Sequence, residues 1–397
     1  MKRRVAQLPL HGGKAPAWLF GRMARLGGAV VMAIVEEYGT AAMLRRLADP
    51  WWFQAFGCVL GFDWHSSGLT TVTCGALKEA RKLYGADLGI LVAGGKGGTS
   101  RKTPREIADA CDRYAISGGD RLVYASRMSA KVDSAAVQDG YQVYHHSFFL
   151  DPSGAWCVVQ QGMNQAQGMA RRYHWLGESV DDFVCEPHSG IEDAPGGEHG
   201  WPATRGTGQE DLPLLNMVAV EAGANRAASA DLVRGNPDRL IEEIRRATEG
   251  PTLFAPAHHP VLPRDVNLAR LRKIVAAAHE RQPADFEKLI SVPGVGPATV
   301  RSLALVAELI YAAPASHRDP AAPPPPEAAA EAPASLKRRW ADYSYAHGGK
   351  DGHPFPVDRP TYDQNINILL DAVRRAKVGE TDKTDALKRL ARMTGRR

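Results

Sequence analysis

Carboxylate and imidazole side chains lie in the first half of the chain at points where a strand is predicted to end or to turn. Asp63 and His65 follow the apolar segment 51–62, and Asp133 and Asp139 precede a predicted hairpin. Such groups hold divalent cations, and a bound ion polarises the water molecule that attacks a phosphodiester. We therefore expect a Mg²⁺ or Mn²⁺ site for phosphodiester hydrolysis, held by Asp63, His65 and Asp139.

Cations and further imidazoles occur close to these positions. Residues 145–146, both His, lie on one strand of the hairpin and residues 160–161, both Gln, on the other, so alternate side chains can face a common site. Lys131, Arg171 and Arg172 could stabilise the charge that develops on a reacting phosphate. The candidate catalytic residues are Asp63, His65, Lys131, Asp133, Asp139, His145 and His174. No spacing among them is diagnostic, and a lone Asp or His at a strand end is more often structural than catalytic.

A second motif, Val-Pro-Gly-Val-Gly-Pro-Ala-Thr, occupies residues 292–299. Two glycines in a turn directly before a helix let backbone N–H groups point at an anion, for which a phosphate is the natural ligand. The pattern resembles the helix-hairpin-helix motif of polymerases, repair nucleases, ligases and glycosylases, which grips the DNA backbone without reading sequence. The DNA contacts expected here are Gly294, Val295, Gly296, Thr299 and Arg301. The alternative is an ordinary pair of helices whose glycines only permit a tight turn.

Other basic positions could extend such a contact. The glycine-rich loop 94–98 lacks the spacing of a phosphate loop that ends in Gly-Lys-Ser/Thr, but its Lys96 could still touch a phosphate backbone, as could Arg171 and Arg172. A basic helical run near the C-terminus could add affinity, with a solvated helix face as the alternative.

The elements that must position these groups alternate between strand, loop and helix in the first half and become helical in the second. We expect helices over 17–48, broken near Gly39, over 74–83 and from Thr103 onward. Buried strands are expected at 51–62 and 88–93, and hairpin strands at 141–150 and 155–163. Residues 186–211 are expected to form a surface loop.

This order predicts an α+β fold, with an α/β N-terminal domain built on a mixed sheet and a separate helical domain. The expected units are a candidate catalytic domain at 1–212, a helical domain at 213–318 with the hairpin motif at 289–311, a Pro/Ala-rich linker at 319–340 and a basic helical segment at 341–397.

Composition sets wide limits. The 397 residues are 44% hydrophobic and 23% charged, enough for two or three globular domains, and a net charge of +5 merely permits an anionic partner. The five cysteines contain no Cys-x-x-Cys, so neither a disulfide framework nor a thiolate zinc site is indicated. The apolar stretch near residues 29–35 is too short to span a bilayer. We expect a cytoplasmic, nucleoid-associated protein without a membrane partner, and the oligomeric state stays open.

Seven segments carry a resemblance to a known family: residues 8–16, 61–68, 131–133, 138–141, 158–163, 171–175 and 347–352. Together they look like the prokaryotic family named domain of unknown function 763, and the resemblance covers nearly the whole chain. The resemblance implies no established activity. One departure is visible, because a Pro/Ala-rich insert separates residues 316–320 from 345–348, which look as though they should be almost adjacent.

These observations favour a DNA-binding protein of repair or recombination, most simply a divalent-metal-dependent nuclease that contacts the DNA backbone independently of sequence. A monofunctional DNA glycosylase is an alternative, since glycosylases with this motif place a catalytic Asp shortly after its second helix and Asp319 lies downstream of it. A non-enzymatic DNA-binding scaffold, whose polar cluster is only a hydrogen-bonded core, is the third hypothesis.

Overall fold

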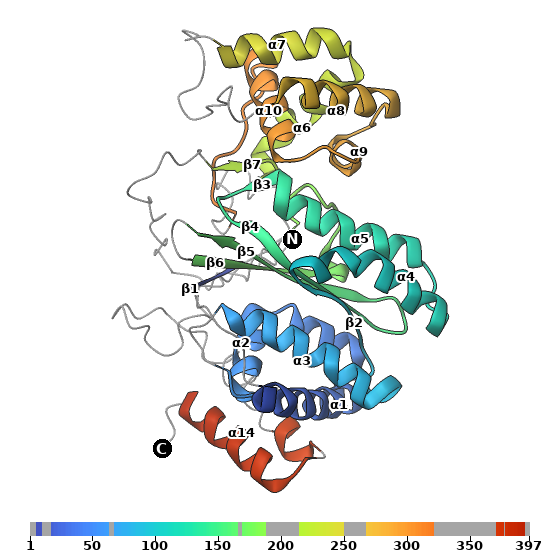
Figure 1. Cartoon of the computed structure of the whole chain (residues 1–397), viewed down its shortest axis with the longest axis vertical. Helices are drawn as coiled ribbons and strands as arrows, with labels where there is room; N and C mark the ends of the chain where they lie inside the picture. Colours follow the sequence, from blue (N-terminus) through green and yellow to red (C-terminus); the bar gives the residue numbers. More distant parts are fainter. Residues whose placement is uncertain are drawn as a thin grey trace.

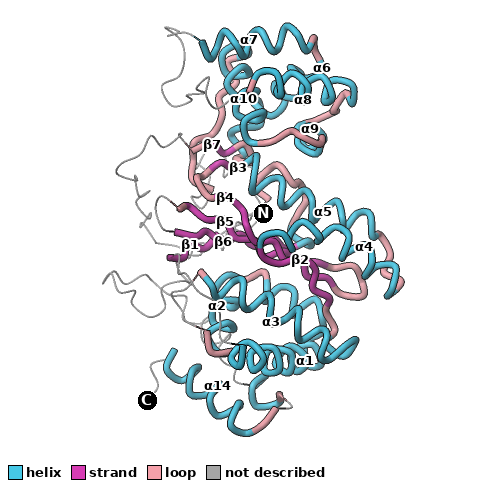
Figure 2. Tube along the Cα trace, in the orientation of Figure 1, coloured by secondary structure: helices cyan, strands magenta, loops and turns pink. Residues whose placement is uncertain are grey.

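The chain folds as a layered α+β protein in which one antiparallel sheet lies between two groups of helices, as a computed structural model shows (Figure 1). The structure describes residues 5–9, 17–62, 67–165, 169–187, 214–249, 267–320, 371–376 and 378–393. Figure 2 shows the strands as a central layer of the molecule. The predicted α+β class is therefore confirmed.

The main sheet has five strands in the order β1-β6-β5-β4-β2. Their bounds are β1 Val5–Pro9, β2 Leu91–Lys96, β4 Gln142–Leu150, β5 Trp156–Asn164 and β6 Met169–Leu176. All pairs are antiparallel, so the expected mixed sheet is wrong. The reason is that β4, β5 and β6 follow one another through short connections, which join antiparallel neighbours. The predicted hairpin over 141–163 is confirmed. Two short strands, β3 Val137–Gln138 and β7 Leu215–Asn216, form a separate ladder.

Alternation along the strands gives the sheet two buried faces. Phe149 and Val159 belong to a core formed with the first three helices, whereas Phe148 and Val158 belong to a core on the opposite face. Successive side chains of a strand point to opposite sides of the sheet. Whether a residue has an odd or an even number within one of these strands therefore decides which face it lies on.

Three helices cover the first face. They are α1 Ala17–Leu47, α2 Pro50–Val59 and α3 Gly68–Tyr84, followed by a short 3₁₀ turn at Gly85–Leu88. The predicted break near Gly39 is confirmed, since Gly39 has φ 81° inside α1. The strand predicted for 51–62 is wrong, because this segment forms α2. A short apolar run that is buried on all sides carries no periodicity that separates strand from helix, and Trp52, Phe53 and Phe56 are fully buried.

The second face is covered by α4 Thr103–Tyr114 and α5 Gly119–Lys131, which ends in one π-helical turn at Val132–Ala136. The later helices share this core: α6 Gly223–Arg234, α7 Pro237–Glu249, α8 Leu268–Arg281, α9 Phe286–Ser291 and α10 Pro297–Tyr311. Their core is therefore continuous with that of α4 and α5. The predicted boundary at 212/213 and most of the predicted loop 186–211 lie outside the described residues.

The last described helix packs against helices from the start of the chain. Helix α14 Glu380–Met393 lies beside α2, where Arg389 Nε donates to the Val59 carbonyl at 2.7 Å, and it also contacts α1, where Arg22 Nε donates to Asp382 at 2.9 Å. Most of the predicted linker and the start of the basic segment, residues 321–370, lie outside the described residues. Over the part that is described, no helix combines the length and apolar character needed to cross a membrane.

Candidate functional site

The structure divides the predicted catalytic residues between the two faces of the sheet. Across the strands, His145 is paired with Gln161 and Gln161 with Arg172, whereas His146 is paired with Gln160. The first set faces α1 to α3 and the second faces α5. A single site that combines all of these side chains is therefore excluded by the strand geometry. Asp63 and His65, two of the three predicted metal ligands, lie outside the described residues.

On the first face, Arg172 and His174 hold the sheet against α1 and α2. Arg172 Nε donates to His174 Nε2 at 2.8 Å, and its other nitrogens donate to Gln54 Oε1 at 2.8 Å and to the Pro50 carbonyl at 2.9 Å. His174 Nδ1 is 3.0 Å from the Leu47 carbonyl oxygen. Burial lowers the pKa of Arg172 to about 9. Both side chains are fully enclosed, so neither faces a ligand in solvent.

His145 lies on the same face and Lys96 at its edge. The His145 ring is buried, with Nε2 3.1 Å from Ser147 Oγ, and burial, helped by His146 and Lys96, lowers its pKa to about 3. Lys96 is exposed and lies over the Tyr144 ring, 5.7 Å from its centroid. Of these two predicted residues, only Lys96 is open to a partner.

Asp139, the third predicted metal ligand, is the centre of a buried ion-pair network. Its Oδ2 accepts from Arg171 Nη1 at 2.7 Å and from Tyr173 Oη at 2.8 Å, and its side chain has no exposed surface. Arg171 also donates to Asp319 at 3.0 Å. The Asp139 carboxylate was predicted to bind a metal ion and the Arg171 guanidinium to contact DNA. Both groups are instead held in these buried contacts. Within the described ranges, no three His, Cys, Asp or Glu side chains are grouped closely enough to hold a metal ion.

On the second face, a buried hydrogen-bond chain runs from Asp133 to Ser126. Asp133 Oδ2 accepts from Gln160 Nε2 at 2.5 Å and from Trp175 Nε1 at 2.9 Å. Gln160 Oε1 is 2.8 Å from His146 Nδ1, and His146 Nε2 is 2.9 Å from Ser126 Oγ. Asp133 is thus a structural anchor for Gln160, and His146 is brought to Ser126 on α5.

The protonation of His146 follows from its neighbours. Gln160 directs its NH₂ group to Asp133 and to the Ser129 carbonyl, so its oxygen must accept from His146 Nδ1–H. His146 Nε2 then carries the lone pair, and Ser126 Oγ–H donates to it. Burial lowers the pKa of His146 to about 4, which keeps the ring neutral near pH 7.

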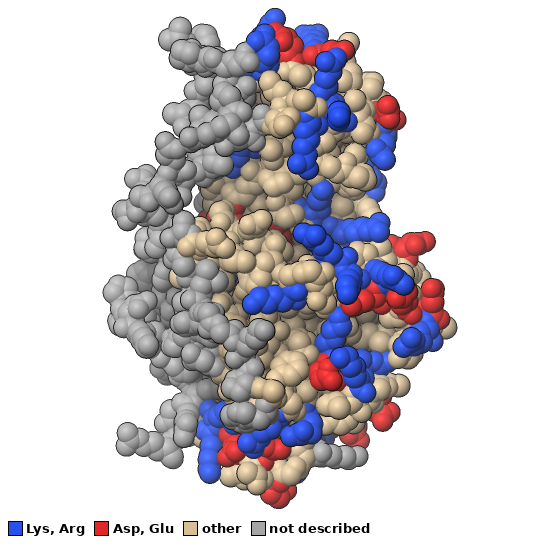
Figure 3. Space-filling model, in the orientation of Figure 1, with Lys and Arg blue, Asp and Glu red and all other residues tan. Residues whose placement is uncertain are grey.

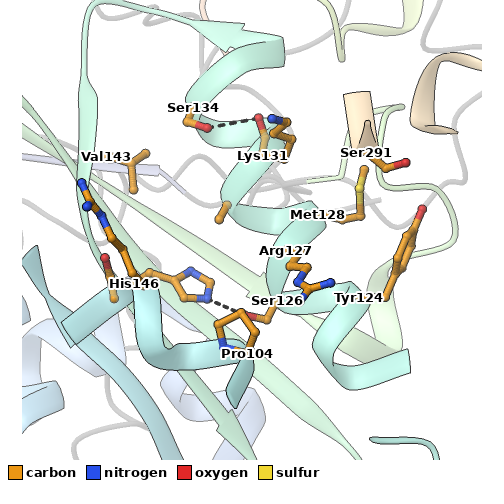
Figure 4. Close-up of a pocket in the computed structure, with 13 residues that line it drawn as sticks. Pro104, Tyr124, Ser126, Arg127, Met128, Lys131, Ser134, Val143, His146 and Ser291 are labelled. Atoms are coloured by element: carbon orange, nitrogen blue, oxygen red, sulfur yellow. Dashed lines mark hydrogen bonds between the residues drawn. The ribbon is translucent and has the colours of Figure 1, made fainter. Parts of the chain in front are cut away.

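Ser126 and His146 line a pocket of about 580 Å³ between α4, α5 and β4. Figure 4 shows His146 reaching toward Ser126, with Arg127, Lys131 and Tyr124 also lining the cavity. Arg101 lies in the wall as well. Arg101 and Arg127 are exposed, and Lys131 is half-buried with a pKa lowered by burial. Among the residues that the structure describes, none of these three cations forms an ion pair with a carboxylate.

The predicted turn adjoins this pocket through Ser291, which ends α9 and lines the cavity. Val292 and Val295 are buried, whereas Pro293 and Gly294 are exposed and Gly296 is half-exposed. Gly294 has φ 92°, a conformation that favours glycine. Helix α10 begins directly after the turn, and no side chain caps its first amides. The backbone of the turn is therefore accessible.

The side chains that follow the turn are less accessible than the sequence suggested. Thr299 is 4% exposed and Arg301 is 5% exposed. Arg301 Nε donates to Gln138 Oε1 at 2.9 Å, and Gln138 in turn donates to the Pro297 carbonyl at 2.9 Å. Arg301 therefore ties α10 to β3, and of the residues predicted to contact DNA here, Gly294 and Gly296 are the accessible ones.

Sequence reasoning missed several members of this surface. Ser126, Arg127 and Arg101 have no motif around them, because helix α5 and the loop before α4 carry them singly. The sequence indicates His146 only as the neighbour of His145 on the predicted strand. Their adjacency in β4 could have shown that they lie on opposite faces of the sheet, because successive side chains of a strand alternate between the faces.

Comparison with known proteins gives a family and no more. The family model described as Protein of unknown function (DUF763) matches residues 4–357. No curated protein and no solved structure matches the chain. Since the matched residues span most of its length, the chain belongs to the DUF763 family.

Proposed function

We propose that this protein binds DNA through the phosphate backbone, at a surface formed by the turn 292–296 and the adjoining basic pocket. The observation that carries the proposal is the position of Ser291, which places the exposed turn directly beside a pocket lined by three cations. On this proposal α9 and α10 act as a helix-hairpin-helix element, with α5 and the loop before α4 as the second half of the interface.

The turn supplies the first kind of contact. The amides at the start of α10 lack a capping side chain, and a helix N-terminus with open N–H groups favours an anion. The side chains of Val292 and Val295 are buried in the core and anchor the turn, so its backbone is held in place before a ligand binds. A phosphate bound in this way is recognised by charge and shape and not by its base.

The cations supply the second kind of contact. Arg101, Arg127 and Lys131 line the same pocket, and an anionic backbone bound there would be attracted to all three charges. Figure 3 shows further Lys and Arg side chains over α4 and α5, interspersed with Asp and Glu, and upward toward α8 and α9. A surface of this kind suits an extended polyanion better than a single small anion, which favours DNA as the partner.

The chemistry expected from the sequence stays a prediction. A metal-dependent nuclease would need carboxylates that are open to an ion, and the contacts of Asp133 and Asp139 do not favour them as ligands. The glycosylase hypothesis assigns its catalytic Asp to Asp319, whose carboxylate accepts a hydrogen bond from Arg171. The non-enzymatic scaffold is compatible with the turn and the pocket. A role in repair or recombination at the nucleoid is proposed together with DNA binding.

Binding to fluorescently labelled oligonucleotides of several sequences, measured by anisotropy over a range of salt concentrations, tests the proposal. We expect binding that does not depend on sequence and a logarithmic affinity that falls linearly with the logarithm of salt, by about 0.9 per phosphate contacted in a duplex. Absence of binding to both single-stranded and duplex DNA at low salt would overturn the proposal.

A further inference from the structure

We infer that Ser126 and His146 form a nucleophile and general base that cleave a phosphodiester bond of nucleic acid bound in the basic pocket. The inference rests on the proposed function for its substrate. It assigns chemistry to two residues outside the catalytic set predicted from the sequence.

The first support is the geometry of the pair. Ser126 Oγ is 2.9 Å from His146 Nε2, within the range in which an imidazole accepts the proton of a hydroxyl nucleophile. Serines inside helices usually bond to a carbonyl of their own helix, as Ser302 does with Ala298 at 2.8 Å and Ser129 does with Ser126 at 3.1 Å. Ser126 instead points its hydroxyl across to a strand.

The second support is the third group that orients the base. Gln160 accepts from His146 Nδ1–H, and Asp133 together with the Ser129 carbonyl fixes the direction of the Gln160 amide. Trp175 Nε1 donates to the same Asp133 oxygen at 2.9 Å. His146 is thereby kept in the tautomer whose Nε2 can take a proton, which is the role that the third member plays in nucleophile–base–orienter sites.

The third support is the setting of the hydroxyl. Ser126 is 2% and His146 4% exposed, but unlike Arg172 and His174 both line a cavity, the one that Arg101, Arg127 and Lys131 also line. Cations beside a nucleophile favour a substrate whose transition state gains negative charge, and a phosphodiester fits this better than a neutral ester. Lys131 is the most enclosed of the three cations, so its charge is the least screened by solvent.

The cleavage reaction consists of two displacements at phosphorus. Ser126 Oγ attacks phosphorus, an Oγ–P bond forms, and the hydroxyl proton passes to His146 Nε2. The P–O bond to the leaving sugar oxygen, which lies in line with the attacking Oγ, breaks; that oxygen takes a proton from water, and His146 releases its proton to water. The strand end is then a phosphoester of Ser126. Water attacks the same phosphorus with His146 again as base, the Oγ–P bond breaks, and Ser126 regains its proton.

The nucleophile is tested with diisopropyl fluorophosphate on the full chain, followed by peptide mass spectrometry. Attack by Ser126 forms an Oγ–P bond and releases fluoride, whether or not DNA binds. We expect one phosphoryl group on Ser126, no label there in Ser126→Ala, and labelling slowed about 100-fold in His146→Gln, the lower range for a general base. Ser134→Ala, at the rim of the pocket, should label like the wild type.

Mapping on the wild-type protein needs no variant to fold, so the test is decisive even where Ser126→Ala is unstable. Absence of label on Ser126 in folded protein, or an undiminished rate in folded His146→Gln, would overturn the inference. If that protein still binds DNA, the proposed function survives alone. Labelled Ser126 in a protein that binds no DNA would overturn nucleic acid as the substrate. Labelled Ser126 together with a DNA–protein adduct that Ser126→Ala lacks would support both.

Discussion

The imidazoles of His145 and His146 are neighbours in strand β4 but lie on opposite faces of the sheet, in separate hydrogen-bond networks. His145 contacts Ser147 on the side of α1 to α3, and His146 contacts Ser126 of α5 on the other. Both rings are almost completely buried, so each must be neutral for the sheet to pack on its two helical layers.

This burial predicts a dependence of stability on pH. The pKa of His145 is lowered to about 3 and that of His146 to about 4, from 6.5. The unfolded chain therefore binds protons that the folded chain excludes, and stability that is complete above pH 6.5 is lost as pH falls toward 4. The free energy of unfolding should fall by roughly 1 kcal/mol per pH unit for each histidine in this range.

Urea denaturation followed by circular dichroism at pH 7, 6 and 5 measures this slope. The variant His146→Gln removes one of the two buried imidazoles and should reduce the slope, because one fewer proton is taken up on unfolding. A slope equal to that of the wild type would show that His146 does not resist protonation in the folded protein.

Asp139→Ala should destabilise the fold strongly. The change leaves Arg171 buried with its Asp139 contact removed, and loss of one partner of a buried ion pair costs about 3 to 5 kcal/mol. Because Asp319 still accepts from Arg171, we expect the lower end of that range. Chemical denaturation at pH 7 gives the value.

The matched control is Glu79→Ala, which removes the partner of an exposed ion pair with Lys82 on α3 and should cost less than about 1 kcal/mol. Equal, small losses in the two variants would contradict a buried structural role for Asp139 and reopen its prediction as a metal ligand.

Replacing Arg127 and Lys131 together by Gln should weaken DNA binding uniformly across sequences. Each phosphate contact that is lost lowers the slope of logarithmic affinity against logarithmic salt by about 1. Lys82→Gln is the control, since Lys82 is exposed on α3, beyond the opposite face of the sheet. Anisotropy titrations at three salt concentrations measure both slopes, and a double variant with the slope of the wild type would remove the pocket from the interface.

Local patterns in the sequence predicted much of the scaffold. The turn at 151–154 between two β-rich runs predicted the β4–β5 hairpin, and Gly39 predicted the break in α1. Segment 51–62 could not be assigned correctly, because a helix buried on all sides shows no polar face. The antiparallel character of the sheet depends on which strands are neighbours, and this is set by packing over the whole chain.

The candidate site was less predictable for a related reason. The turn 292–296 is a contiguous motif and could be identified from spacing alone. Ser126 and His146 are 20 positions apart, and their contact exists only because α5 packs on β4. Likewise, no local pattern around Asp139 indicates that Arg171 and Tyr173, 32 and 34 positions away, donate to its carboxylate.

The most direct test of DNA binding at the turn is the affinity of Gly296→Ala. Gly296 has φ −141°, which any residue adopts, and an added Cβ would meet nothing nearer than the Gly294 oxygen at 3.8 Å, so the fold should tolerate the change. The methyl group would stand where a phosphate approaches α10. Losing one hydrogen bond to a charged group costs about 1.5 to 3 kcal/mol, so we expect binding at least about tenfold weaker by anisotropy.

Gly21→Ala in α1, where a Cβ meets nothing within 4 Å, is the matched control and should bind like the wild type. Selective loss of affinity in Gly296→Ala, with neither melting temperature lowered, is the predicted result. Wild-type affinity in a folded Gly296→Ala protein would contradict the central claim that this turn holds the DNA backbone.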